Sequence, residues 1–124
     1  MRRGIILNAR LSGVIDVACL ADVKAALLTV TRDVSRYEAH QKKDKYIVWA
    51  EDSQGDSVWA DGQMQDQAIQ GTIDYFTKHE NDPNVMKIQQ ALNDCGISFR
   101  LNSVQYEDDT KYIHYEWVFE VDEW

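Results

Sequence analysis

The sequence predicts an α+β fold: a mainly antiparallel β-sheet with two principal helices packed on it, in an order of roughly α-β-β-β-β-α-β-β. Two segments repeat apolar residues at the three- and four-residue steps of a helix. The segments around them alternate apolar and polar residues, as half-buried strands do. The 124 residues give room for one domain, which we assign to residues 20–124. Residues 1–19 are assigned to an N-terminal arm or a lead-in to the first helix.

The first helix is predicted within residues 14–31. Its apolar stripe consists of Val14, Val17, Leu20, Val23, Leu27 and Val30. Asp22 has a side chain suited to capping a shorter helix that starts there. After the helix, Val34 and Tyr37 favour a short strand, and a polar loop follows at residues 41–45.

Strands are predicted next. Residues 46–50 form one strand, residues 51–56 a hairpin turn, and residues 57–60 the start of the return strand. A longer strand at residues 67–77 has two different faces. One face carries Ile69, Gly71, Ile73 and Tyr75, and the other carries Gln70, Thr72 and Asp74.

The second helix has the clearest signals. Asp82 is predicted as its N-cap, Pro83 as its first helical residue and Gly96 as its C-terminal stop. Between these residues one apolar stripe can lie on a sheet. It consists of Val85, Ile88, Ala91, Leu92 and Cys95.

Two strands close the chain. Leu101 and Val104 have opposite parity, so we expect a bulge near residues 102–103 that brings both to one face. A turn is predicted at residues 107–110. In the last strand Ile113, Tyr115, Trp117, Phe119 and Val121 face one way, and His114, Glu116, Glu120 and Asp122 face the other.

The net charge is negative and unevenly distributed. The chain has 13 Lys and Arg against 21 Asp and Glu, a formal net charge of −8. Residues 1–45 have a balance of +4 and residues 46–124 a balance of −12. A solvated acidic surface explains this asymmetry, and so does a field that repels nucleic acid or orients copies of the chain. Since the sequence has no basic stripe with interleaved aromatics, we expect no sequence-specific binding to nucleic acid.

Neither export nor membrane insertion is predicted. A spanning helix needs a run of about 18 apolar residues, and the sequence has none. Asn8, Arg10 and Asp16 interrupt the apolar stretch that a signal peptide requires. Cys19 and Cys95 lie far apart, so we expect two buried thiols in a reducing cytosol, without a disulfide or a metal.

No catalytic, cofactor-binding or metal-binding residue is assigned, and we predict that the chain is not an enzyme and has no cofactor. His40, His79 and His114 share no helix at one-turn spacing. The acidic run at residues 107–109 lacks the spaced oxygen ligands and the glycine of a calcium loop. The sequence has neither a nucleophile elbow nor a glycine-rich phosphate loop.

Aromatic residues are more numerous than one small core needs, with four Trp, six Tyr and three Phe. Residues 46–50 are apolar on both faces of their predicted strand. Either this surplus forms a protein–protein contact, or the first helix and the N-terminal arm cover the second face of the sheet.

Several of these segments together resemble a pattern that recurs in phage tail proteins. In chain order the segments are an aromatic-Ile-Val-aromatic strand (45–51), an aromatic-Ala-Asp return (58–62), a further strand (73–77), an Asp-Pro helix start (82–83), a Gly-Ile-Ser helix exit (91–98) and a closing strand (112–121). Over residues 20–121 the chain is similar to the tail completion or tail terminator proteins of long-tailed bacteriophages (siphoviruses) and of prophages in Gram-positive bacteria.

The resemblance implies a structural role in virion assembly. Such proteins form a ring, often a hexamer, that caps the finished tail tube and presents a surface to the head–tail connector. The implied partners are further copies of the chain, the tail tube protein and the connector, with no membrane. The implied location is the head-proximal end of the virion tail, after assembly in the bacterial host cytoplasm. DNA would pass through the ring, and acidic side chains in the lumen would repel its phosphates.

Two other functions fit the composition. A small acidic inhibitor, either an immunity-type protein or a DNA mimic, would share the charge and the aromatics and act on a basic partner. An enzyme or ligand-binding module of the open α+β kind would require a deep pocket with convergent polar groups.

Overall fold

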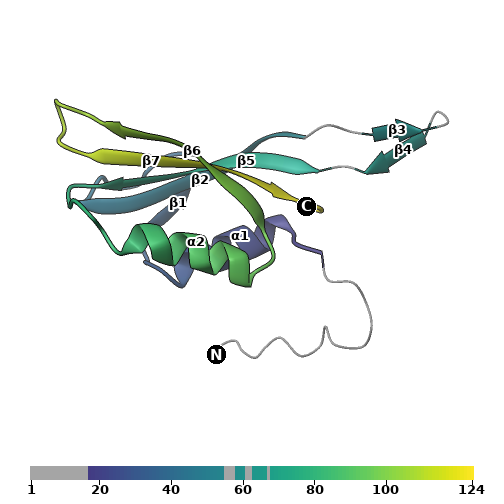
Figure 1. Ribbon diagram of the computed structural model, residues 1–124, viewed down its shortest axis with the longest axis horizontal. Helices are drawn as coiled ribbons and strands as arrows, with labels where there is room; N and C mark the ends of the chain where they lie inside the picture. The colour runs from purple at the N-terminus through teal and green to yellow at the C-terminus, as the bar shows by residue number, and fades with distance from the viewer. Residues whose placement is uncertain (1–16, 55–57, 61–62, 67) are drawn as a thin grey trace.

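The fold is a helix layer on one face of a sheet. The computed structural model describes residues 17–54, 58–60, 63–66 and 68–124. Within these residues, two helices lie on the same face of a five-stranded sheet of order β1-β2-β5-β7-β6 (Figure 1). β1 (Val34–Arg36) runs parallel to β2 (Lys45–Gln54), and all other neighbours in this sheet are antiparallel. The predicted α+β class with a mainly antiparallel sheet is confirmed.

Helix α1 (Leu20–Leu28) is shorter than the predicted apolar stripe. Cys19 is its N-cap, and the Cys19 N–H donates to the Asp22 carboxylate at 2.9 Å. Asp22 therefore supports the cap from the third helical position, and its prediction as the cap itself is wrong. Residues 14–16 of the predicted helix and most of the predicted arm at 1–19 lie outside the described residues.

The predicted hairpin turn at residues 51–56 is wrong for residues 51–54, and its residues 55 and 56 lie outside the described residues. β2 continues to Gln54 and pairs with β5 through a bulge between Glu51 and Ser53. The polar run after Ala50 suggested a turn, but a ladder of backbone hydrogen bonds can continue past the apolar core. The predicted return strand is β3 (Val58–Ala60), and its partner is β4 (Gln63–Asp66). In Figure 1 this pair lies beyond the ends of β2 and β5.

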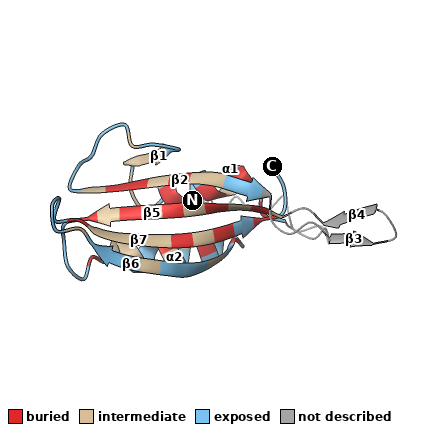
Figure 2. Ribbon diagram, turned by 90° about the horizontal axis from the view of Figure 1, so that it is seen from above, coloured by how far each residue is buried: buried red, intermediate tan, exposed pale blue. Residues whose placement is uncertain are grey.

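β5 (Ile69–Thr77) confirms the predicted alternation, since its buried and half-buried residues alternate along the whole strand (Figure 2). Gly71 lies on its buried face. A Cβ added there would lie 2.2 Å from the Ala50 carbonyl oxygen and 2.5 Å from the Phe119 ring. Glycine is therefore required at this position by the close approach of its neighbours.

Helix α2 (Asn84–Asp94) confirms the predicted helix. Its bounds place Pro83 at the N-cap, but Pro83 already has helical angles, with φ of −64° and ψ of −18°. The Asp82 carboxylate accepts the Asn84 N–H at 2.9 Å, which is the hydrogen bond of a capping side chain. Gly96 has φ of 70° and ends the helix as predicted.

β6 (Ser98–Tyr106) and β7 (Ile113–Val121) form the closing hairpin. Their register shifts between Leu101 and Ser103, which confirms the predicted bulge. Because of the bulge, Leu101 and Val104 point to the same side of the sheet. Their partners in the pairing with β7 are Trp117 and Tyr115, respectively. The alternation of β7 is confirmed by its buried residues Trp117, Phe119 and Val121.

The core lies between the sheet and the helices. Trp117 and Trp49 are among its largest members, at 0% and 2% exposure. Both helices occupy this one face, so α1 does not cover the second face of the sheet, which was one of the two alternatives for the aromatic surplus (Figures 1 and 2). We call that second face the open face. Cys19 and Cys95 are half-buried and form no disulfide. Within the described residues, neither helix is long and apolar enough to cross a membrane.

Candidate functional site

Three regions of the described surface carry side chains that could serve a function: the open face, the start of α2, and the two outer edges of the sheet. His40 and His79, which were considered as metal ligands, are both exposed. His114 differs from them, because it is half-buried on β7 and belongs to the open face.

Carboxylates surround the His114 ring. Its Nε2 lies 2.6 Å from Asp74 Oδ1, on the neighbouring strand β5, and its Nδ1 lies 3.8 Å from Glu107 Oε2. The ring also stacks on Phe76, with 4.2 Å between the centroids. The hydrogen bond with Asp74 outweighs burial and raises the pKa of His114 above its ordinary value of 6.5. The ring therefore keeps its proton to a higher pH than a free histidine.

Three of these side chains could together hold a cation. Asp74, His114 and Glu116 each offer one ligand atom, and these atoms lie within 4.8 Å of one another. Imidazole with carboxylates suits zinc and similar cations. However, the short hydrogen bond between Asp74 and His114 already satisfies two of the three groups, and a metal would have to replace it. We call His114 and the carboxylates around it the acidic cluster. It contains one titratable ring, and its hydrogen bonding is complete without a metal.

A groove of about 440 Å³ lies beside this cluster on the open face. Aromatic rings form part of it: Tyr46 stacks on Phe76 at 4.8 Å, and Tyr112 meets Tyr46 edge-on at 5.5 Å. The Tyr112 hydroxyl donates to the Lys43 carbonyl at 2.6 Å, which ties the loop before β2 to the loop before β7. Burial raises the pKa of Tyr46 to about 12, so its hydroxyl stays neutral. These contacts explain how the second apolar face of β2 is covered.

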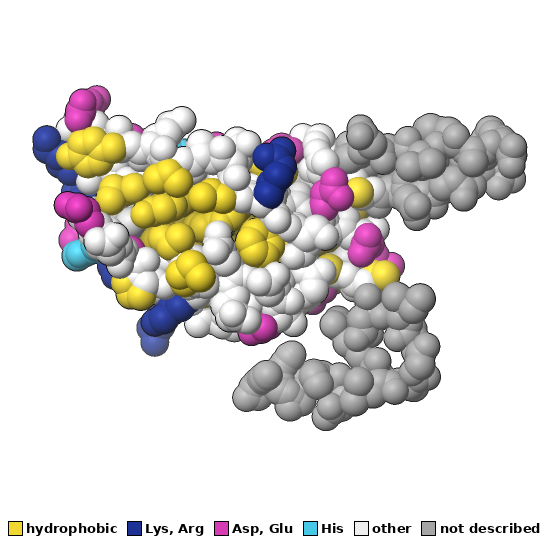
Figure 3. Space-filling view, in the orientation of Figure 1, with side chains coloured by type: hydrophobic (Ala, Val, Ile, Leu, Met, Phe, Trp, Pro, Cys, Tyr) yellow, Lys and Arg dark blue, Asp and Glu magenta, His cyan; other side chains and the backbone are white. Residues whose placement is uncertain are grey.

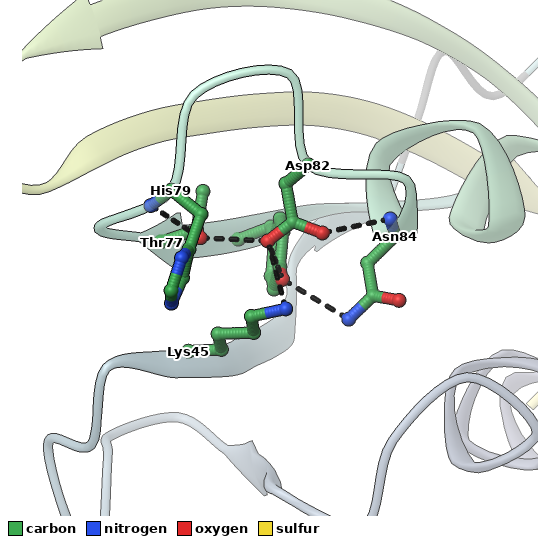
Figure 4. Close-up of polar contacts among 6 residues, drawn as sticks. Lys45, Thr77, His79, Asp82 and Asn84 are labelled. Atoms are coloured by element: carbon green, nitrogen blue, oxygen red, sulfur yellow. Dashed lines mark hydrogen bonds and ion pairs between the residues drawn. The ribbon is translucent and has the colours of Figure 1, made fainter.

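The start of α2 contains a buried carboxylate (Figure 4). Asp82 Oδ2 accepts hydrogen bonds from the hydroxyls of Tyr75 and Thr77, each at 2.7 Å, and lies 3.5 Å from Lys45 Nζ. Burial alone would raise the pKa of Asp82, but the hydrogen bonds from Thr77, the Asn84 N–H and Tyr75 hold it below its ordinary value. The Asp82 side chain is 0% exposed, so it is positioned to join β5 to α2 and not to meet a ligand.

The outer edges of the sheet expose apolar side chains. The β6 patch consists of Leu101, Val104, Tyr106 and, from α2, Met86, which are 45 to 66% exposed. In Figure 3 hydrophobic atoms gather where β6, β7 and α2 lie. Leu28, at the end of α1, and Tyr37, directly after β1, are exposed as well, at 45% and 62%. Several neighbouring exposed apolar side chains, as in the β6 patch, are typical of contact sites, whereas single ones are normal on any surface.

The acidic cluster and the β6 patch were not predicted as sites. The alternation of the last strand does place His114 and Glu116 on one face, but the cluster also needs the pairing of β5 with β7. Similarly, only the strand order shows that β1 and β6 are the edges. No model of a known protein family and no curated protein sequence matches this chain.

Proposed function

We propose that this chain is a structural phage or prophage tail protein that caps the tail tube as a ring and joins it to the head connector. The proposal rests on the sequence resemblance described above. The fold that the resemblance implies, a small sheet with flanking helices, agrees with the observed one.

One observation carries the proposal furthest. The described surface exposes large apolar side chains in more than one place: at the β6 patch, and also at Leu28, Tyr37, Val17 and Trp124. Ring subunits need two different contact surfaces, because each copy binds one neighbour on either side. A ligand-binding function would instead favour an enclosed pocket with convergent polar groups. The groove on the open face is lined by aromatic rings together with charged side chains, a mixture that suits contact with a protein.

Labelling of particles tests the proposal. An affinity tag on this protein, detected with gold in particles from the bacterium that carries the gene, should mark the head-proximal end of the tail. An untagged strain is the control for background label. Normal particles without label at any position would contradict a structural role.

The acidic inhibitor is the second candidate, and the acidic cluster on the open face favours it. Asp74, Glu107 and Glu116 lie around one titratable ring there. If the tail carries no label, a basic protein that co-purifies with the wild-type chain and is lost with Asp74→Asn/Glu116→Gln would support this function.

A further inference from the structure

We propose that residues 1–16 of this chain bind along the outer edge of β6 as an added antiparallel strand, with their apolar side chains over the β6 patch. This contact lies within one chain and does not rest on the proposed function. A docked arm would be the surface that a neighbouring molecule meets at this edge.

The β6 edge is long and lacks a cover. β6 provides nine residues at the end of the sheet, and no described strand pairs with its outer side. Natural proteins cover or blunt such edges, because the unpaired backbone groups are a template for other chains. Leu101 pairs with Trp117, which lies in the core between sheet and helices, so Leu101 is on the helix side. Val104 and Tyr106 share that side after the bulge, yet all three are 45 to 58% exposed. A covering segment would have to supply both backbone hydrogen bonds and apolar side chains.

The sequence of residues 5–15 has the alternation of a half-buried strand. The apolar side chains at odd positions are Ile5, Leu7, Ala9, Leu11 and Ile15. The polar side chains at even positions are Asn8, Arg10 and Ser12, and Ile6 and Val14 are the exceptions.

β6 is divided between its two faces in the same way. Ser98, Arg100 and Gln105 lie on the side opposite Leu101, as their pairing with β7 shows. A strand from residues 5–15 beside β6 would therefore continue the apolar face of the sheet on the helix side and the polar face on the other.

The chain enters the described structure close to the start of β6. The Asp122 and Glu123 N–H groups donate to the Ala18 carbonyl at 2.9 and 3.3 Å, directly after the end of β7. Ser98, the first residue of β6, lies opposite Glu120 near the same end of β7. A segment that leads back from residue 17 along the β6 edge therefore runs antiparallel to β6. Sixteen extended residues reach about 50 Å, whereas a nine-residue strand is about 30 Å long, so the arm can follow the whole edge.

Charge favours this direction. It brings Arg2 and Arg3 to the far end of β6, where the turn contains Asp108 and Asp109. Both carboxylates are exposed, and no Lys or Arg in the described part of the chain forms an ion pair with either. The two arginines would thus meet carboxylates that another basic side chain does not already hold.

Hydrogen exchange of the full-length chain, followed by NMR, tests the docked arm. The amides to observe are those of β6 whose N–H groups point away from β7. The arm variant is Leu7→Asp/Leu11→Asp, on the apolar face of the added strand. Its matched control is Asn8→Asp/Ser12→Asp, which adds two carboxylates to the same segment on the opposite face. The amides of β5, in the middle of the sheet, show whether each variant is folded.

In wild type and in the control we expect these β6 amides to exchange at least about a hundredfold more slowly than amides of an unfolded chain. In the arm variant they should exchange about tenfold faster than in wild type, or more, because the apolar contacts of two leucines are lost. The β5 amides should exchange alike in all three proteins.

A charge exchange tests the direction of the arm. Arg2→Glu/Arg3→Glu should speed exchange at the Tyr106 end of β6, and adding Asp108→Arg/Asp109→Arg should slow it again. Lys24→Glu/Lys87→Glu makes the same charge changes at exposed helix positions and should have no effect there. This test also decides the question if the arm variant does not fold, since a missing restoration would contradict the docked arm.

Three results of the exchange experiment would overturn the docked arm. Unprotected β6 amides in wild type would show that the edge is open. Protection that persists in a folded arm variant would show that another segment covers it. Protection that grows with protein concentration would assign the edge to a second copy. None of these results depends on where gold label lies on particles, so the docked arm and the tail function can fail separately.

Discussion

At the scale of single residues, Asp82 connects two elements. Its carboxylate binds two hydroxyls of β5 and the first N–H of α2, from a fully buried position. Asp82→Asn keeps the shape but replaces one acceptor oxygen with an N–H donor. We expect it to lower the free energy of unfolding by about 2 kcal/mol or more, measured by urea denaturation. Asp109→Asn, in the exposed turn after β6, is the control and should change stability by less than about 0.5 kcal/mol.

The comparison of wild type with Asp82→Asn also tests how the free energy of unfolding depends on pH. The pKa of Asp82 is lowered in the folded chain from an ordinary value of 3.8. Its contribution to stability is therefore present above pH 3.8 and is lost as pH falls through the lowered pKa. The stability difference between wild type and Asp82→Asn should shrink in that acidic range. A difference that stays constant on acidification would show that the carboxylate charge does not stabilise the fold.

His114 gives a prediction of the opposite sign. Its pKa is raised above 6.5 by the hydrogen bond with Asp74, so this pair stabilises the fold below pH 6.5 and ceases to do so as pH rises through the raised pKa. Asp74→Asn should move the pKa of His114 downward in an NMR titration of the ring C–H signals. Glu120→Gln, a carboxylate on the same face outside the cluster, is the control. An unchanged His114 titration in Asp74→Asn would show that the two side chains do not interact in solution.

At the scale of elements, Gly71 sets how closely three strands approach. The Ala50 carbonyl and the Phe119 ring, from β2 and β7, leave no room for a Cβ on this residue of β5. Gly71→Ala should therefore cost about 2 kcal/mol or more of stability in urea denaturation, through overpacking. In the double variant, Phe119→Leu removes the ring that the new Cβ would meet, but the Ala50 carbonyl oxygen at 2.2 Å remains. After the effect of Phe119→Leu alone is subtracted, the double variant should therefore regain only part of the stability that Gly71→Ala loses. A Gly71→Ala protein as stable as wild type would contradict this packing.

Local signals predicted the elements that depend on local chemistry. The Asp-Pro start and the glycine stop predicted α2, and strict alternation predicted β5 and β7. Residues 51–54 could not be assigned in this way, since whether a polar run is a turn or a strand depends on its partner. β5 supplies that partner from a segment 15 or more residues further along the chain. The acidic cluster has the same origin, because Asp74 and His114 meet only through the pairing of their strands.

At the scale of the whole molecule, the sheet has one face covered by helices and two edges that differ in length and apolar content. Most of the basic side chains around β1 are held in ion pairs within the chain, Arg36 with Glu51, Lys43 with Asp33 and Lys45 with Asp82. A subunit with two unlike edges can join a ring without any symmetric contact. We propose that copies of this chain build the cap on the tail tube.

Electron cryomicroscopy of the head-proximal end of purified tails tests this claim most directly. The particles would come from the bacterium that carries the gene. We predict a closed ring of this chain between tail tube and connector. A ring at that position built from another protein would contradict the proposed function.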